Sequence, residues 1–168
     1  MNISRDDIRI RDALPADAPH LLRWWNDGAV MAHAGFPKGL GTTYEKVLER
    51  IEKGLLYIIE YDGTPIGEMN HRPCGAAAEI GIKICEEEYR DRGIGRRVLT
   101  LFIQELFSMG FEKILLDTNL QNLRAQHVYE SLGFRKLRVN RNSWHDQLGE
   151  LQSSVDYELT PSSFLPFL

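Results

Sequence analysis

The chain has 168 residues, and its 20 Lys and Arg against 24 Asp and Glu give a formal net charge of −4. With 43% hydrophobic and 26% charged residues it has the composition of a folded globular protein, which excludes an extended disordered chain. The acidic balance argues against a general nucleic-acid or anionic-membrane binder, because such proteins neutralise phosphates with clustered Lys and Arg. The length predicts a single domain over 1–168.

No apolar run approaches the ~20 residues that a membrane helix needs, and segment 1–12 is charged where a signal peptide would be apolar. We therefore expect a cytoplasmic protein with no membrane partner and no nucleic-acid partner. Cys74 and Cys85 have no second Cys pair and no Cys/His ladder at zinc spacing. We expect both thiols to be reduced and structural, and we expect no metal site.

The chain begins with one strand and one helix. Apolar and polar residues alternate over 8–11, as in a half-buried strand. Pro15 is tolerated in the first turn of the helix that follows, and Asp27 with Gly28 ends it. The Gly-rich stretch 29–41 has neither the helical nor the strand period of apolar residues, so we assign it no secondary structure. Such loops often border binding sites.

A helix and the strongest hairpin signal in the chain come next. Thr42 and Glu45 have the spacing of a capping box, and apolar residues recur at helical spacing to residue 54. The hydrophobic pattern then changes to the two-residue period of a strand over 55–61 and 64–71. These two predicted strands lie on either side of the Asp62-Gly63 turn and form a hairpin.

The second half of the chain mixes long helices with further strands. Helices are predicted at 93–110 and 122–132, and strands at 77–85, 113–118, 134–144 and 151–160. In all, the sequence predicts seven strands and four helices. Their order is that of an α/β (α+β) protein with a mixed sheet covered by helices, rather than a doubly wound one.

The segment 89–97, between a strand and the start of a long helix, has the features of a phosphate cradle. Gly93 and Gly95 lack a Cβ and allow close approach to the backbone, and the first N–H groups of the helix point at an anion placed there. The segment also holds four arginines, Arg90, Arg92, Arg96 and Arg97. A solvated Gly-rich turn would explain the same spacing. The loop lacks the Lys-Ser/Thr ending of a P-loop, which excludes nucleotide-dependent phosphotransfer.

The pattern Arg90-x-x-Gly93-x-Gly95 resembles the acetyl-CoA pyrophosphate motif of the GNAT superfamily of N-acetyltransferases. About 30 residues later, the segment 119–134 resembles the downstream cofactor and acid-site helix of that superfamily. Residues 22–27 resemble the first helix of the branch that contains ribosomal-protein N-terminal and spermidine acetyltransferases. The resemblance implies a mixed, mostly antiparallel sheet of about seven strands with a splayed central pair, flanked by four helices.

The resemblance also implies acetyl-CoA as acetyl donor and assigns residues to its binding. The backbone around Arg92, Gly93, Ile94, Gly95, Arg96 and Arg97 would hold the pyrophosphate, with the arginine side chains, including Arg90, adding charge. The strand at Ile82, Lys83 and Ile84 would bind the pantetheine arm as an added strand would. The segment that holds Asn119, Asn122, Ala125 and Tyr129 would line the same arm.

By the same resemblance, the Tyr129 phenol donates a proton to the leaving thiolate, although a tyrosine at helical spacing is by default a core residue. The amine must lose a proton before it attacks, and Glu79, a carboxylate inside an apolar strand, is the first candidate for the base. An edge carboxylate that faces solvent or pairs with an arginine would explain Glu79 equally well. Glu68 and His71 are second choices.

The function predicted is direct acetyl transfer from acetyl-CoA to a primary amine, either a small cationic amine or a protein N-terminus. The alternative is a catalytically silent module that binds acyl-CoA. The acidic run 86–88 is expected to be a solvated loop. Trp24, Trp25 and Trp144 are compatible with core positions or with an acceptor pocket. The apolar segment 161–168 could pack on its own domain or on a second subunit, so the sequence leaves monomer and homodimer open.

Overall fold

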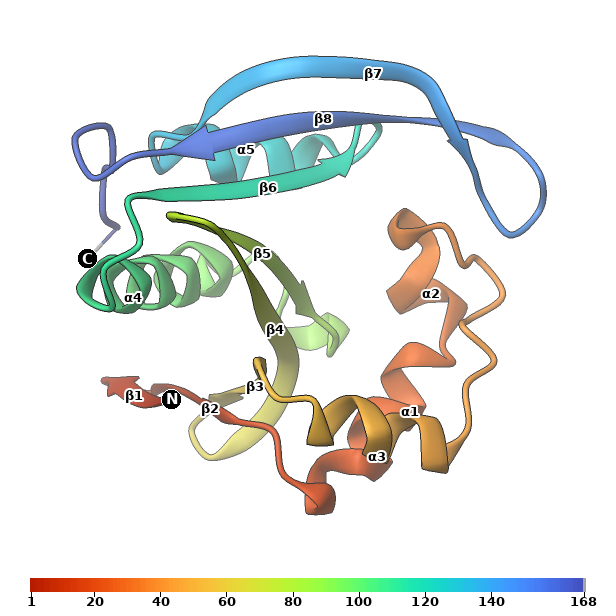
Figure 1. Ribbon diagram of the computed structural model, residues 1–168. Helices are drawn as coiled ribbons and strands as arrows, with labels where there is room; N and C mark the ends of the chain where they lie inside the picture. Colours follow the sequence, from red (N-terminus) through yellow and green to blue (C-terminus); the bar gives the residue numbers. More distant parts are fainter. Residues whose placement is uncertain (168) are drawn as a thin grey trace.

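The computed structural model describes residues 1–167 as one eight-stranded sheet and five α-helices (Figure 1). The strands are β1 (Asn2–Arg5), β2 (Ile8–Asp12), β3 (Leu56–Tyr61), β4 (Thr64–Cys74), β5 (Ala77–Ile84), β6 (Lys113–Asn119), β7 (Arg135–His145) and β8 (Leu151–Leu159). The helices are α1 (Ala18–Trp25), α2 (Gly28–Met31), α3 (Tyr44–Glu52), α4 (Ile94–Ser108) and α5 (Leu123–Ser131). The predicted mixed α/β class is confirmed.

The strand order is β1-β2-β3-β4-β5-β6-β8-β7, and every neighbouring pair is antiparallel except β5 and β6. That central parallel pair is in register for only three residue pairs, from Ala77 opposite Lys113 to Glu79 opposite Leu115. Beyond Glu79 the two strands continue without pairing. The sheet therefore splays at its centre, as the resemblance implied.

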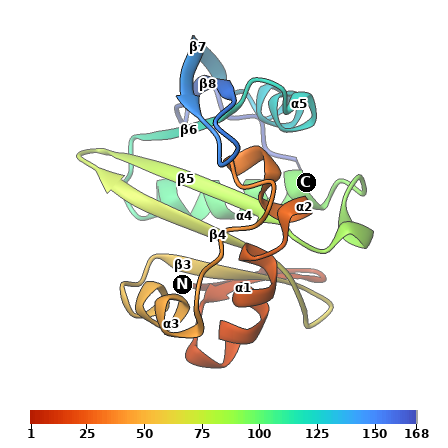
Figure 2. The same cartoon turned by 90° about the vertical axis from the view of Figure 1, so that its right-hand side faces the viewer.

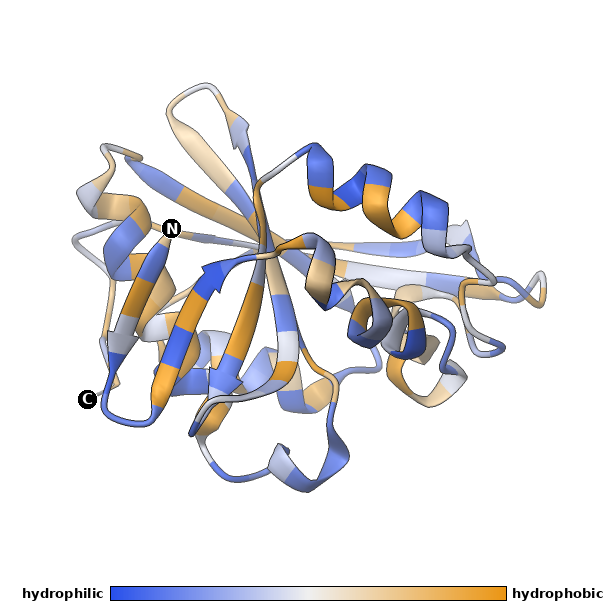
Figure 3. Ribbon diagram, turned by 90° about the horizontal axis from the view of Figure 1, so that it is seen from below, coloured by the Kyte–Doolittle hydropathy of each residue, from blue (hydrophilic) through white to orange (hydrophobic). Residues whose placement is uncertain are grey.

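Helices cover both faces of the sheet because successive side chains of a strand point in opposite directions. Tyr57 and Ile59 of β3 join the larger core, which contains the buried stripe of α4 and part of α5. Leu56 and Ile58 point the other way, into a smaller core with α1 and α3. Figure 2 separates α5 from the α1–α3 pair, and Figure 3 shows hydrophobic and hydrophilic residues alternating along the strands.

Three local predictions need correction. The strand β1 pairs with β2 and was missed because its residues are mostly exposed and carry no apolar alternation. The unassigned stretch 29–41 contains most of α2, which Asp27 caps through the Ala29 N–H, so there are five helices instead of four. The cap of α3 is Thr43 rather than Thr42, because the Thr43 hydroxyl accepts from the Lys46 N–H.

The first crossover from sheet to helix is held by a buried ion-pair network. The Arg11 guanidinium of β2 contacts Asp17 at 2.7 Å and also Glu60 of β3. Asp17 in turn accepts from the Leu14 N–H at 2.8 Å. Burial alone would raise the pKa of Asp17, but the hydrogen bonds from Arg11 and Leu14 outweigh it and hold that pKa below its usual value.

Both cysteines are free thiols, as expected. Burial raises the pKa of Cys85, so its thiol stays protonated and is unsuited to act as a nucleophile. Within residues 1–167, no helix is both long and apolar enough to cross a membrane.

Replacing Asp17 by Asn should lower the free energy of unfolding at neutral pH by about 3 kcal/mol, because the change leaves a buried Arg11 without its main counter-charge. The folded-state pKa of Asp17 is lowered, so its stabilisation is present above the pKa of the unfolded state and is lost as the pH falls through the folded-state value. Urea unfolding at a series of pH values measures both effects.

The control is Asp12→Asn, which removes a 61% exposed carboxylate from an ion pair with the N-terminal amine. Its effect should stay below about 1 kcal/mol. An Asp17→Asn variant that is as stable as this control would contradict the assignment.

Candidate active site

An open cleft of about 1280 Å³ runs along the splay of the sheet. Its walls come from the diverging ends of β5 and β6, the first turns of α4 and α5, and α2 with the residues after it. Among the predicted cofactor-binding residues, the cleft is lined by Ile82, Lys83, Ile84, Arg90, Gly93, Ile94, Gly95, Arg96, Asn119, Asn122, Ala125 and Tyr129. The fold therefore brings most of the predicted site to one place.

The N-terminus of α4 forms an uncapped cradle at one end of the cleft. Gly93, the N-cap, adopts a left-handed φ of 74° that favours glycine, and no side chain caps the helix. A Cβ added at Gly93 or Gly95 would meet nothing within 4 Å. The first N–H groups of α4 therefore face open space, where the helix dipole favours an anion.

The four arginines of this segment divide into two pairs. Arg90 and Arg96 line the cleft, and the Arg90 Nε donates to the Ile84 carbonyl at 3.0 Å. Arg97 instead forms an ion pair with Asp7 in the turn between β1 and β2. The Arg92 guanidinium lies 5.7 Å from the ring centroid of Tyr61.

Arg92 and Arg97 are not among the residues that line the cleft. The expectation that all four arginine side chains add charge at the site therefore needs correction. The physical reason is that an Asp and aromatic faces elsewhere in the fold compete for two of the guanidinium groups.

The strand β5 offers free backbone to the cleft. Ile82, Lys83 and Ile84 lie beyond the last residue that pairs with β6, so the β5 edge that faces β6 makes no ladder hydrogen bonds there. Such an edge accepts an extended ligand that carries amide groups. The Lys83 ammonium lies 3.7 Å from Glu68, whose carboxylate is 97% buried.

Residues at the start of α5 shape the opposite lip. Asn122 is the N-cap of the helix, and its side-chain oxygen accepts from the Ala125 N–H at 3.2 Å. Asn119, at the end of β6, accepts from the Gln121 N–H and so holds the turn that leads into α5. Both residues line the cleft, but these side-chain oxygens are engaged in positioning α5.

Tyr129 reaches the inner end of the cleft from α5. Its side chain is 8% exposed, and its ring packs edge-on against Phe134 and Tyr157. Within the described part of the chain the hydroxyl has no hydrogen-bond partner, so it is free to meet a ligand. Burial, together with the negative charge of Asp117, raises the pKa of Tyr129 to about 12.

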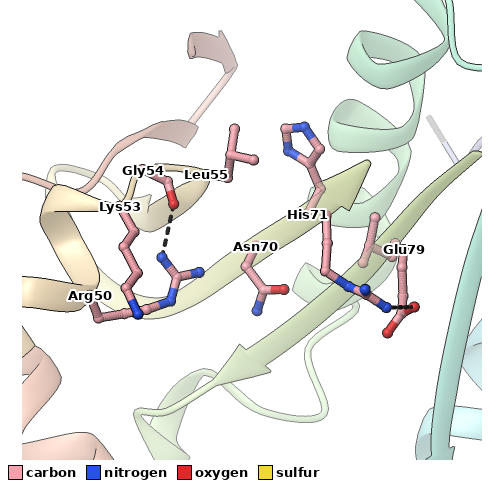
Figure 4. Close-up of a pocket in the computed structure, with 9 residues that line it drawn as sticks. Arg50, Lys53, Gly54, Leu55, Asn70, His71 and Glu79 are labelled. Atoms are coloured by element: carbon pink, nitrogen blue, oxygen red, sulfur yellow. Dashed lines mark hydrogen bonds and ion pairs between the residues drawn. The ribbon is translucent and has the colours of Figure 1, made fainter. Parts of the chain in front are cut away.

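The structure does not bring Glu79 to this cleft. Glu79 lines a separate pocket of about 320 Å³ beside α3, shown in Figure 4 with Arg50 and Asn70. Its carboxylate forms an ion pair of 2.6 Å with Arg72 and is 43% exposed. The pairing with an arginine, one of the two readings that the sequence left open, is the one observed.

The second choices for a base are also engaged elsewhere. The His71 ring is buried, with its Nδ1 2.9 Å from the Tyr57 hydroxyl, and burial lowers its pKa. Glu68 lies beneath Lys83, and one of its carboxylate oxygens, although buried, has no hydrogen-bond partner among residues 1–167. Neither residue lines the large cleft.

Asp117 was missed by the sequence analysis and is the carboxylate that does line the cleft. It lies on β6 just beyond the splay, directly opposite Asp156 of β8. Asp117 is exposed, but the protein atoms around it remove part of its hydration and so raise its pKa, and the charges of Asp156 and Glu79 add to the effect. The sequence signal was a lone acidic residue inside the apolar strand 113–118, the same criterion that selected Glu79.

The β7–β8 hairpin contacts the segment after α2 beside the cleft. The Gln147 side chain accepts from the Lys38 N–H at 2.9 Å and donates to the Gly39 carbonyl at 2.9 Å. The Trp144 ring lies against Gly35, where an added Cβ would come within 2.4 Å of it. These contacts join the hairpin to the segment after α2 and place Trp144 in the cleft wall.

Trp24, in contrast to Trp144, belongs to the core. Trp24 is 1% exposed, and its indole N–H donates to Glu86 at 2.8 Å. Arg23 also contacts Glu86, at 2.6 Å. Glu86 therefore anchors α1, which corrects the expectation of a solvated acidic run, while Glu87 and Glu88 are exposed.

Comparison with known proteins shows to which family the chain is similar. The sequence profile of the acetyltransferase (GNAT) family matches residues 25–134. The [ribosomal protein bS18]-alanine N-acetyltransferase of Escherichia coli is 35% identical over 57 residues, which are 34% of this chain and 38% of that protein. The matches to the first curated relatives span only 32% to 39% of those proteins.

Solved structures share the fold over nearly the whole chain. A ribosomal L7/L12 alpha-N-protein acetyltransferase in complex with coenzyme A superposes with a TM-score of 0.84 at 15% identity, covering 95% of this chain and 98% of that one. The spermidine N-acetyltransferase of Vibrio cholerae, in complex with coenzyme A and spermine, gives a TM-score of 0.82 at 17% identity, covering 94% and 97%. At these identities the similarity is one of fold.

The Tyr129 hydroxyl should stay protonated across the neutral and moderately alkaline range. Its raised pKa predicts that the difference between the ultraviolet titrations of wild type and Tyr129→Phe shows no phenolate below about pH 11, provided that circular dichroism shows both proteins folded. A phenolate signal near pH 10 in that difference would mean that Tyr129 is far more solvated than in this structure.

Proposed function

The chain belongs to the acetyltransferase (GNAT) family, and on that premise we propose that it transfers the acetyl group of acetyl-CoA directly to a primary amine. One observation carries the proposal: a single cleft joins the uncapped N-terminus of α4 to the point where β5 and β6 separate. A helix N-terminus suits a diphosphate, and free strand edges suit an arm with two amide groups. Acetyl-CoA contains both groups in that order.

The residues present fit such a donor. The N–H groups at Gly93–Arg96 would hold the diphosphate, with Arg90 and Arg96 adding charge. The backbone at Ile82–Ile84 would hold the arm, and Ala125 leaves room for it. When bound, the donor supplies an activated acetyl thioester.

Tyr129 would act as the proton donor. Its hydroxyl keeps its proton at neutral pH, lies in the cleft and has no partner among the described side chains. A phenol of this kind can protonate a departing thiolate, which restores a neutral thiol as the carbon–sulfur bond breaks.

Asp117 rather than Glu79 would take the proton from the amine. It lines the cleft, as Tyr129 does, and its raised pKa makes it a stronger base than an ordinary aspartate. Glu79 faces a different pocket and is held by Arg72. One proton therefore leaves the acceptor nitrogen for Asp117 before the new carbon–nitrogen bond forms. The second proton, which the nitrogen loses as the amide forms, restores the Tyr129 phenol after it has protonated the thiolate.

The acceptor class that this arrangement favours is a small cationic amine or a protein N-terminus. Asp117 attracts an ammonium group, and Trp144 and the residues after α2 line the same cleft. By their names, two similar proteins act on an alanine of a ribosomal protein and on spermidine. A panel that contains both kinds of amine will identify the acceptor.

The cradle is tested by Gly95→Leu. Gly95 has ordinary helical geometry, and a Cβ there meets open space, so the variant should fold with an unchanged Tm while its side chain fills the cradle. We expect the Kd for coenzyme A to rise by roughly a hundredfold or more, because several charge-assisted hydrogen bonds of about 1.5–3 kcal/mol each are lost. Isothermal titration calorimetry measures the change.

Arg92→Ala is the matched control for the cradle, because the Arg92 side chain lies over the Tyr61 and Tyr89 rings and does not itself line the cleft. Its Kd should stay close to that of wild type. Equal losses in both variants would show that the anion does not sit on α4.

The chemistry is tested by free-thiol release from acetyl-CoA with the amine panel. Tyr129→Phe and Asp117→Asn should each lower kcat/KM by about 10²–10⁴, whereas Glu79→Gln should lose far less. In wild type, kcat/KM should fall as the pH drops through the raised pKa of Asp117, and Asp117→Asn should lack that limb.

A larger loss in Glu79→Gln than in Asp117→Asn would return the role of base to Glu79. Tight binding of coenzyme A without turnover on any amine would instead support a silent acyl-CoA-binding module.

A further inference from the structure

Residues 161–167, here called the tail, run across α4 and α5 rather than away from the domain. The Leu165 N–H donates to the Leu132 carbonyl at 2.9 Å, and the Phe164 ring meets Phe107 of α4 edge-on at 6.0 Å between centroids. The Phe167 N–H donates to the Thr100 hydroxyl at 3.0 Å, and Thr100 is only 1% exposed. The tail is therefore anchored at three points along its length.

The turn after α5 is shaped to receive the tail. Gly133 has a φ of 96°, and a Cβ there would lie 1.9 Å from the Ser163 carbonyl oxygen. Only a glycine permits this approach. The Ser163 side chain also closes a local turn with the Thr160 N–H at 3.2 Å. The position of the tail is thus specified by backbone contacts as well as by apolar packing.

Phe167, the last residue of the tail, lies at the wall of the large cleft. Phe167 lines that cleft together with Arg96, and the Arg96 guanidinium lies 5.2 Å from the centre of the Phe167 ring. The ring is 39% exposed although the backbone beside it is fixed on Thr100. An aromatic face and a cation are therefore held in place next to the phosphate cradle, open to the cleft.

We propose that Phe167 and Arg96 form the binding surface for the adenine base of coenzyme A, a contribution of the tail to the donor site. The inference rests on the proposed function. The diphosphate of the donor connects its arm to its nucleoside, and the arm leads into the splay of β5 and β6. The nucleoside must leave the cradle by another route, where α4 and the tail supply the wall. Purines stack on aromatic rings and on guanidinium planes.

The test compares two ligands that share the pantetheine arm and its first phosphate. Coenzyme A and phosphopantetheine, which lacks the whole 3′-phospho-AMP part, are titrated into wild type and Phe167→Ala, and the Kd values are measured by calorimetry. Loss of one stacking partner is expected to raise the Kd for coenzyme A by roughly tenfold. The Kd for phosphopantetheine should not change, so the ratio of the two Kd values reports on the adenine contact alone.

Three further variants separate stacking from packing. Phe167→Trp keeps an aromatic face and should retain tight binding, whereas Phe167→Leu keeps apolar bulk and should behave as Phe167→Ala. Phe164→Ala removes a tail contact that faces α4 outside the cleft, and its ratio of Kd values should equal that of wild type.

Three other outcomes would contradict either the adenine contact or the proposed function. If Phe167→Ala binds coenzyme A as wild type does, or more tightly, the tail is not an adenine-binding surface. If both ligands weaken equally, Phe167 serves only the shape of the cradle and the proposal fails. If wild type binds no coenzyme A, the proposed function itself is wrong, which is a different result from the loss of the adenine contact.

Discussion

The parallel pairing of β5 with β6 stops after three residue pairs, and the rest of the site depends on that limit. Backbone N–H and C=O groups inside a protein need partners, so a sheet that opens at its centre must present polar edges to whatever fills the gap. In this chain the gap continues to the start of α4, whose first N–H groups have no capping side chain. One interruption in the ladder thus creates a cleft that has free strand edges in its wall and the uncapped start of α4 at one end.

The four arginines of segment 89–97 lie close together in sequence, but tertiary contacts direct two of them away from the cleft. Arg97 is committed to Asp7 and holds the turn between β1 and β2 against α4, while Arg92 lies on Tyr61 and Tyr89. Only Arg90 and Arg96 remain at the cleft. Binding of an anion there depends on backbone N–H groups and the helix dipole together with these two cations, a geometry-specific arrangement that a free arginine cluster would not provide.

The proton-transfer groups reach the cleft from opposite faces of the sheet. Leu116 pairs with Tyr157, on which the Tyr129 ring packs, whereas the next residue, Asp117, pairs with Asp156 and points to the other face. In the proposed reaction the donor is bound from the side of α4 and α5, and the acceptor approaches from the side of α2 and Trp144. In this arrangement Asp117 would take a proton from the amine and Tyr129 would supply one to the thiolate. The proposed transfer therefore needs no covalent enzyme intermediate.

The sequence by itself determined the types of most elements, the mixed sheet and the glycine-rich loop before α4, because these follow from local periodicity, turn chemistry and two glycines at fixed spacing. It also selected Tyr129 as a candidate, through a resemblance over 119–134. It could not choose between Glu79 and Asp117, since each is a lone carboxylate in an apolar strand and only the end of the β5–β6 register decides which one faces the cleft. Strand β1 likewise depends on its pairing with β2, and the anchoring role of Glu86 and the place of Phe167 depend on partners 62 and 67 residues away in the chain. Long-range pairing is a property of the folded chain, and no local pattern encodes it.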